Sequence, residues 1–323
     1  MTGHFLKYIL CGLLMISAAL IYGCGPKARP GEESRPVIKP FSLIYEGRIS
    51  GNVFNVPLND PLGLASDADG NIYVVDAGNR RLIKFDNQLK PIRETGGFGI
   101  SETLFNSPTF VSIDNNLNLY VSDVGNQRIS IYDTRLNYVD MIELADFDDP
   151  GKFGRPDGIA INDYGELWIA DPDNSRISVF DNSGRFDRYV GDVETYSGLL
   201  LTPRAVTRGQ KGKVLVSDAG RSGVYVFDSF GLYLFDFGYD VLERPSGLKV
   251  DNFDNIWVTD SRLSTLFCFD RDGLLLYSVG VYGKAGEYNF DKPNDVTILP
   301  GNRIAVSDTG NDRIMIYKIL YPE

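Results

Sequence analysis

The sequence predicts an all-β fold made of six repeated units, each a small four-stranded sheet. Six segments begin with Pro and reach an Asp fifteen residues later, and successive prolines are 47, 48, 47, 42 and 48 residues apart. Each copy holds four short runs of alternating apolar and polar residues, broken by Asp, Asn and Gly. No window of eleven or more residues after the first 24 has helical periodicity. Six such units predict a six-bladed β-propeller, because closing the array into a ring removes exposed sheet edges.

The first 24 residues predict export and lipidation. One basic residue, Lys7, precedes the apolar run "ILCGLLMISAALIYG", which is too short for a comfortable spanning helix. The sequence "IYGC" resembles a bacterial lipobox, which implies a signal peptide over residues 1–23 and a diacyl and N-acyl (palmitate) group on Cys24. The alternative reading is an uncleaved N-terminal anchor.

Residues 24–40 are predicted to form a tether. They contain "GPKARPGEESRPVIKP", a proline-rich stretch without apolar periodicity, which extends rather than packs. The residue after Cys24 is Gly25 rather than Asp, and by analogy with enterobacterial sorting this favours the outer membrane. We therefore expect a lipoprotein of the cell envelope, facing the periplasm or the exterior.

The third repeat illustrates how one unit is built. The runs "PDGIAIN", "LWIAD", "RISVFD" and "RFDRYVG" are rich in β-branched and aromatic residues, and "DYGE", "PDNS" and "NSG" separate them as turns. This pattern predicts an antiparallel meander of four strands.

The two ends of the repeat array predict how the ring closes. After the third strand of the sixth copy, "RIMIYK", only "ILYPE" remains, so the fourth strand is missing. A spare strand, "FSLIYEGRIS" over residues 41–50, precedes the first proline. We expect this strand to form the outer strand of the last blade, which makes residues 41–323 one propeller domain.

Charge and residue usage exclude several functions. The chain has a net charge of −11, and loss of Lys7 with the signal would make the mature form −12, which argues against nucleic acid as a partner. The only histidine, His4, lies in the signal, so the domain cannot form a Ser-His or Cys-His pair or a His-ligated zinc site. Of the three cysteines, Cys268 alone falls in the domain, within "LFCFD", and is expected to be a buried strand residue.

The repeats "PLGLASDADGNIYVVDAGNRRLIKFD" and "PDGIAINDYGELWIADPDNSRISVFD" resemble NHL repeats. The resemblance covers residues 41–321 and implies a six-bladed propeller that most often binds protein, peptide, glycan or RNA. Some enzymes have similar rings, among them amidating lyases, whose zinc is held by histidines, and calcium lactonases. A calcium lactonase with only carboxylate and amide ligands remains compatible with this sequence.

A recurrent Asp, Asn and Arg follow the second strand of most copies, as in "DVGNQRISIYD" from Asp123. Because a substrate site must be asymmetric, repetition around a ring favours a structural role. The Asp and Asn are expected to accept backbone N–H groups in the hairpin turn, and the Arg to pair with a carboxylate.

Deviations from the repeat mark the candidate binding site. Copies four and five lose the Asn and Arg, and carry Arg221 in "DAGRSG" and Arg262 in "DSRLST". The two positions after each repeat proline are expected to open near the central channel on the face of the inter-blade loops. The candidate ligand-binding residues are Thr109, Phe110, Asp157, Arg204, Arg221, Arg262, Asn294 and Asp295. They suggest a pocket with a basic edge for a carboxylate or acidic sugar; the alternative is drift in tolerant loops with solvated charges.

The function expected from the sequence is a lipid-anchored recognition or scaffolding propeller. It would bind an envelope protein, peptide or glycan through the inter-blade loop face, without catalysis and without a cofactor. The alternative is a calcium-dependent hydrolase or lactonase, with Asp157, Asn294 and Asp295 as metal ligands. A scaffold without a small ligand would instead present a large exposed apolar patch.

Overall fold

A computed structural model describes residues 38–40, 42–144, 153–192 and 198–322. Residues 1–36 and 37–323 form separate units, and the second holds all the described residues. The predicted signal peptide, Cys24 and most of the predicted tether lie outside the described residues.

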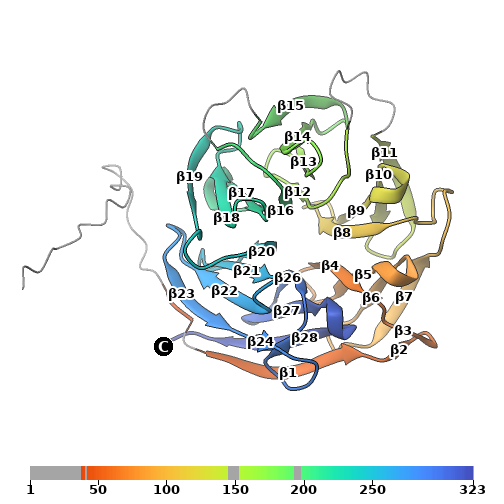
Figure 1. Cartoon of the computed structure of the whole chain (residues 1–323). Coiled ribbons are helices and arrows are strands. Elements are labelled where there is room, and N and C mark those ends of the chain that lie inside the picture. The colour runs from red at the N-terminus through yellow and green to blue at the C-terminus, as the bar shows by residue number, and fades with distance from the viewer. Residues whose placement is uncertain (1–37, 41, 145–152, 193–197, 323) are drawn as a thin grey trace, which may run out of the picture. The chain divides into compact units, whose positions relative to one another are not determined.

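The described chain forms six four-stranded antiparallel sheets arranged around a centre, as Figure 1 shows. The predicted six-bladed propeller is therefore confirmed. Blade 1 contains β4 (Pro61–Ser66), β5 (Ile72–Asp76), β6 (Arg81–Phe85) and β7 (Pro91–Gly96). Blade 2 contains β8 (Pro108–Ile113), β9 (Asn118–Asp123), β10 (Arg128–Asp133) and β11 (Tyr138–Glu143). Blade 3 contains β12 (Ile159–Ile161), β13 (Leu167–Asp171), β14 (Arg176–Phe180) and β15 (Phe186–Val190).

Blades 4 and 5 have the same order of strands. They contain β16 (Pro203–Arg208), β17 (Val214–Asp218), β18 (Gly223–Phe227) and β19 (Tyr233–Phe237), then β20 (Pro245–Val250), β21 (Ile256–Asp260), β22 (Thr265–Phe269) and β23 (Leu275–Val279). The loops hold two small two-stranded sheets, β2 (Asn52–Val53) with β3 (Val56–Pro57) and β24 (Val281–Tyr282) with β25 (Asn289–Phe290). They also hold four short 3-10 turns: η1 (Ala77–Asn79), η2 (Val124–Asn126), η3 (Gln210–Gly212) and η4 (Thr309–Asn311).

Blade 6 closes the ring with strands from both ends of the domain. Its order is β26 (Pro293–Leu299), β27 (Arg303–Asp308), β28 (Arg313–Leu320) and, outermost, β1 (Ser42–Ser50). β1 pairs antiparallel with β28 from Ser42 opposite Leu320 to Ser50 opposite Arg313. The expectation that residues 41–50 supply the missing outer strand is confirmed for the described residues.

The apolar core lies in layers between neighbouring blades. One layer packs Val75 and Leu82 of blade 1 against Val111 and Val121 of blade 2. Another packs Ile49 of β1 with Leu64 and Val74 of blade 1, so the seam where the ring closes is as apolar as the others. Cys268 is a free, fully buried thiol in β22, as expected.

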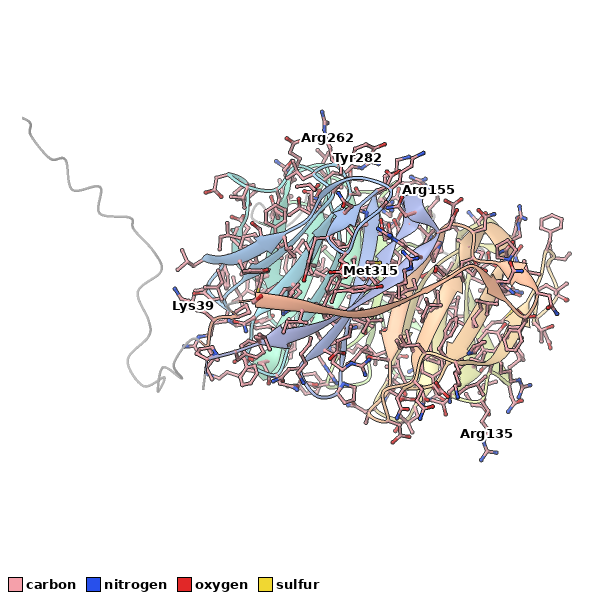
Figure 2. All side chains as sticks on the ribbon, turned by 90° about the horizontal axis from the view of Figure 1, so that it is seen from below. Lys39, Arg135, Arg155, Arg262, Tyr282 and Met315 are labelled. Atoms are coloured by element: carbon pink, nitrogen blue, oxygen red, sulfur yellow. The ribbon has the colours of Figure 1, made fainter. Side chains whose placement is uncertain are left out.

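The loops divide the ring into two faces. We call the top face the one that carries the turns between the second and third strands, such as η1, together with the loops that enter the innermost strands. Figure 2 shows Arg155, Arg262 and Tyr282 along this face and Arg135, from a turn between third and fourth strands, on the opposite, bottom face.

The chain enters the propeller from the bottom side. Ser42 starts β1 at the end of β28 that is remote from the top-face turn preceding Arg313. The Ile38 carbonyl accepts a hydrogen bond from Nδ2 of Asn255, in a bottom-face turn of blade 5, at 3.1 Å. The segment that leads into the domain therefore lies away from the top face.

Candidate functional site

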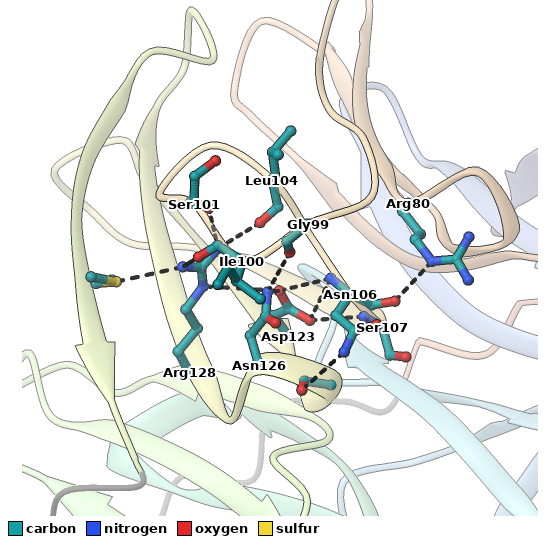
Figure 3. Close-up of polar contacts among 12 residues, drawn as sticks. Arg80, Gly99, Ile100, Ser101, Leu104, Asn106, Ser107, Asp123, Asn126 and Arg128 are labelled. Carbon is teal, nitrogen blue, oxygen red and sulfur yellow. Dashed lines mark hydrogen bonds and ion pairs between the residues drawn. The ribbon is translucent and has the colours of Figure 1, made fainter.

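Where they occur together, the recurrent Asp, Asn and Arg join a blade to the loop that precedes it. In blade 2, Asp123 accepts the backbone N–H groups of Asn106 and Ser107, and Asn126 donates its side-chain amide to Asp123 and to the Gly99 carbonyl (Figure 3). The Arg128 guanidinium donates to three carbonyls of the same loop, those of Ile100, Ser101 and Leu104. These residues fasten the scaffold.

Blade 1 repeats this arrangement with one carboxylate at its centre. Asp76 accepts the Asn59 N–H at 2.8 Å, the Asn79 amide at 2.9 Å and the Arg81 Nε at 2.7 Å. The structural interpretation is therefore correct, with two corrections for blades 1 and 2. There the Asn donates its amide instead of accepting, and the backbone donors to the Asp belong to the inter-blade loop instead of the hairpin turn, because the carboxylate at the strand end faces that loop.

Blades 4 and 5 satisfy the same buried carboxylate without a cation. Asp260 accepts N–H groups from Glu243 and Arg244 in the inter-blade loop and from Arg262 and Leu263 in its own turn, at 2.7–3.0 Å. Asp218 likewise accepts four backbone N–H groups. Backbone donors replace the missing Asn and Arg, so these two carboxylates need no side-chain donor from their turns.

A cavity of about 620 Å³ opens on the top face beside blade 5. Its volume is typical of small-molecule sites, about 300–1,000 Å³. Blades 1, 4, 5 and 6 contribute to its wall. The lining residues are Leu62, Arg204, Arg244, Pro245, Ser246, Ser261, Arg262, Ser264, Tyr282, Asp291, Lys292, Asn294 and Thr309. We call this the top-face cavity.

Three of the sequence-predicted site residues lie together in the top-face cavity: Arg204, Arg262 and Asn294. Arg204 also pairs with a fourth, Asp157, at 2.6 Å, and Arg262 pairs with the exposed Glu243 at 2.8 Å. The remaining predicted residues, Thr109, Phe110, Arg221 and Asp295, do not line the cavity.

The two positions after each repeat proline have different surroundings. The first position lines the cavity in four blades, at Leu62, Arg204, Ser246 and Asn294. The second position packs between blades: a Cβ on Gly247 would lie 2.5 Å from the Asp295 Cα. The expectation that both positions open near the channel mouth is therefore met at the first position only.

Asn294 is the polar residue of the cavity with an unmet bonding requirement. Asn294 is 8% exposed, and among the described residues its side-chain Nδ2 has no hydrogen-bond acceptor. Leaving a buried donor unmade costs about 1–3 kcal/mol. Thr109 Oγ1 is also buried without a partner, but it does not line the cavity.

Arg244, Lys292 and Tyr282 were missed by the sequence analysis although they line the cavity. Arg244 and Lys292 stand directly before the repeat prolines of blades 5 and 6, where the other copies have Asp60, Ser107, Arg155 and Thr202. A comparison one residue upstream of each repeat proline would have found both cations. Tyr282 lies in the loop before blade 6, outside the repeat.

Two carboxylates proposed as metal ligands already have donors. Both oxygens of Asp295 accept backbone N–H groups, from Leu64 at 2.9 Å and Val296 at 2.8 Å. Asp157 is held by Arg204. In the described part of the chain no three His, Cys, Asp or Glu side chains gather as a ligand set. Binding of a calcium ion by Asp157, Asn294 and Asp295 would therefore require the two carboxylates to exchange their present donors.

Burial controls the protonation of both aspartates. It raises the pKa of Asp295 to about 7, although the Leu64 N–H and the ammonium of Lys249 oppose the shift. It also raises the pKa of Asp157, against the opposing effect of Arg204. Burial lowers the pKa of Lys249, which faces Asp295.

No helix within the described residues is long and apolar enough to cross a membrane. The lipidation expected at Cys24 stays a prediction, since that residue is not among those described.

Family models match two parts of the propeller. The NHL repeat model matches residues 58–85, and the model of the SMP-30/gluconolactonase/LRE-like region matches residues 103–192. Among curated proteins, "Protein brain tumor" of Drosophila melanogaster is 28% identical over 99 residues, which is 30% of this chain and 10% of that protein. The chain thus spans about a tenth of the length of this relative.

Solved structures share the fold at low identity. A streptogramin B lyase has a TM-score of 0.62 at 11% identity, over 85% of this chain and 98% of its own. A luciferin-regenerating enzyme has a TM-score of 0.61 at 13% identity, over 84% and 94%. A Bacteroides thetaiotaomicron protein of unknown function has a TM-score of 0.62 at 14% identity, over 85% and 73%. The chain therefore folds as a six-bladed β-propeller, and its first blade matches the NHL repeat model.

Proposed function

We propose that the chain is a lipid-anchored recognition propeller of the cell envelope, in the outer membrane. It binds an envelope protein, peptide or glycan through its top face and performs no catalysis. The top-face cavity supports this proposal most directly, because its wall combines cations with a buried amide that has no partner. Its wall offers no histidine, since His4 is the only one in the chain.

The path of the chain supports the direction in which the cavity faces. The end of the predicted tether contacts blade 5 on the bottom side, through Ile38 and Asn255. The described part of the tether thus leaves the top face free for a partner.

Photo-crosslinking tests recognition by the top face. A photoreactive phenylalanine analogue replaces Tyr282, 68% exposed on the top face, or Tyr164, 65% exposed in a bottom-face turn. Crosslinked partners are expected from position 282 and not from position 164, in cells that carry the full lipidated chain. Equal adducts from both positions, or none from 282, would contradict the proposal.

Fractionation tests the anchor separately. Cys24→Ser is expected to move the protein from the membrane to the soluble envelope fraction and to abolish palmitate labelling, because the acylated thiol is lost. Cys268→Ser is the matched control, since this thiol is buried in β22. Retention of the Cys24→Ser protein in the membrane would favour the uncleaved anchor.

A second function is favoured by one observation. The SMP-30/gluconolactonase/LRE-like match covers blades 2 and 3, including Asp157, and supports a calcium-dependent hydrolase or lactonase. This reading requires Asp157 and Asp295 to release their present donors for the metal. Isothermal titration with calcium distinguishes the two functions. Stoichiometric binding that disappears in Asp157→Asn would favour the enzyme, and no binding would favour recognition.

A further inference from the structure

We propose that the top-face cavity binds an acidic saccharide, with the sugar carboxylate held by Arg244, Lys292 and Asn294. The inference rests on the proposed recognition function and names the chemistry of its ligand. Four cationic side chains and one carboxylate line the cavity, in a chain whose net charge is −11. This local reversal of charge selects an anion.

The two cations that carry the site make no ion pair within the described part of the chain. Arg204 and Arg262 are paired with Asp157 and Glu243. Arg244 and Lys292 are exposed and, among the described residues, make no ion pair. Arginine binds a carboxylate through two parallel hydrogen bonds, so Arg244 provides orientation as well as charge.

The Asn294 amide supplies the buried end of the site. Its Nδ2 needs an acceptor, and a carboxylate oxygen of the ligand would provide one. This amide makes no hydrogen bond among the described residues of the free protein and would make one in the complex. It would therefore contribute to affinity without contributing to the stability of the fold.

The hydroxyl groups of the wall can accept hydrogen bonds, which a carboxylate group cannot donate. Ser246, Ser261 and Thr309 donate to backbone carbonyls, and their oxygens keep lone pairs that accept hydrogen bonds. An ionised carboxylate only accepts, so O–H donors elsewhere on the ligand would be the groups that use these oxygens. A uronic acid carries both groups on one ring.

The remaining wall suits a sugar better than a peptide. Tyr282 offers an exposed aromatic face on which the C–H face of a sugar ring can stack. Leu62 and Pro245 are the aliphatic residues of the lining. The cavity thus provides little apolar surface for peptide side chains.

Calorimetry with the full chain tests the inference, with trigalacturonic acid as the probe and its methyl ester as the neutral match. The acid is expected to bind at least about tenfold more tightly than the ester. Arg244→Gln/Lys292→Gln is expected to weaken the acid at least about tenfold and to flatten its dependence on salt. Lys90→Gln/Arg135→Gln, the same loss of charge on exposed bottom-face turns, should leave binding unchanged.

A second variant separates binding from folding. Asn294→Ala is expected to weaken trigalacturonic acid at least about tenfold while its thermal midpoint does not fall below the wild-type value, since the amide bonds nothing among the described residues of the free protein. Equal affinity for acid and ester would overturn the inference. So would binding of tri-glutamate in place of trigalacturonic acid, which would assign the cavity to an acidic peptide. If neither binds while position 282 still yields crosslinks, the saccharide inference falls and recognition stands; if the crosslinks also fail, both fall.

Discussion

At the scale of single residues, stability depends on how each buried aspartate is compensated. Arg313 pairs with Asp308 at 2.7 Å, and both side chains are almost fully buried. Arg313→Met would leave Asp308 without its cation and the Asn289 carbonyl without its donor, so we expect a loss of about 3–5 kcal/mol. Urea unfolding measures this loss. Arg155→Met is the control, because the Arg155–Asp173 pair is exposed and its removal should leave the midpoint nearly unchanged.

Asp295 makes stability depend on pH in a defined direction. Burial raises its pKa in the folded chain to about 7, above the ordinary value of 3.8. The folded state therefore holds this proton where the unfolded state has released it, and stability from this group falls as pH rises from about 4 to about 7. Between about pH 5 and about pH 8 the wild type should lose about 2–3 kcal/mol more than Asp295→Asn. Identical losses in urea unfolding of the two proteins would contradict this assignment.

At the scale of elements, the innermost strands alternate between glycine and larger residues at the second position after the proline. Gly63, Gly158 and Gly247 of blades 1, 3 and 5 face Phe110, Ala205 and Asp295 of blades 2, 4 and 6. A Cβ on Gly63 would lie 2.6 Å from the Phe110 Cα. The blades thus meet in three close pairs around the centre.

This close approach predicts the effect of adding one methyl group. Gly158→Ala would press against the Arg204 carbonyl and the Ala205 Cα, so we expect a loss of about 1–3 kcal/mol in urea unfolding. Because these are backbone atoms, adding Ala205→Gly should not restore stability. Rescue by the double variant would show that the contact involves the Ala205 methyl instead.

The register of the blades was predictable from the sequence, and much of the site was not. The fifteen-residue spacing from Pro to Asp corresponds to a direct strand pair, such as Pro61 with Asp76 and Pro245 with Asp260. Repetition makes this spacing visible, and departures from it revealed Arg262 in the turn of blade 5. Tyr282 lies in a loop without repeat register, so its place in the cavity depends on how neighbouring blades pack.

At the scale of the whole molecule, the short connection into blade 5 explains why the cavity lies there. The 42-residue interval between Pro203 and Pro245 is the shortest of the five. In blade 1 the Arg81 guanidinium donates to the Val53 and Val56 carbonyls and holds the preceding loop over the top face. Blade 5 has Thr265 at that position, and its preceding loop leaves the mouth uncovered.

Closure of the ring by β1 predicts that the propeller unfolds as a unit. β1 covers the edge of β28, and its Leu43 and Ile49 are 3% and 5% exposed. A chain that begins at residue 51 would expose that edge and the apolar seam between blades 6 and 1. We expect it to lose the single cooperative urea transition and to self-associate through β28 in size-exclusion chromatography. A chain that begins at residue 37 keeps every strand and should behave as the full domain does. If both chains stayed monomeric and unfolded alike, blade 6 would be stable with three strands, and β1 would not be what closes the ring.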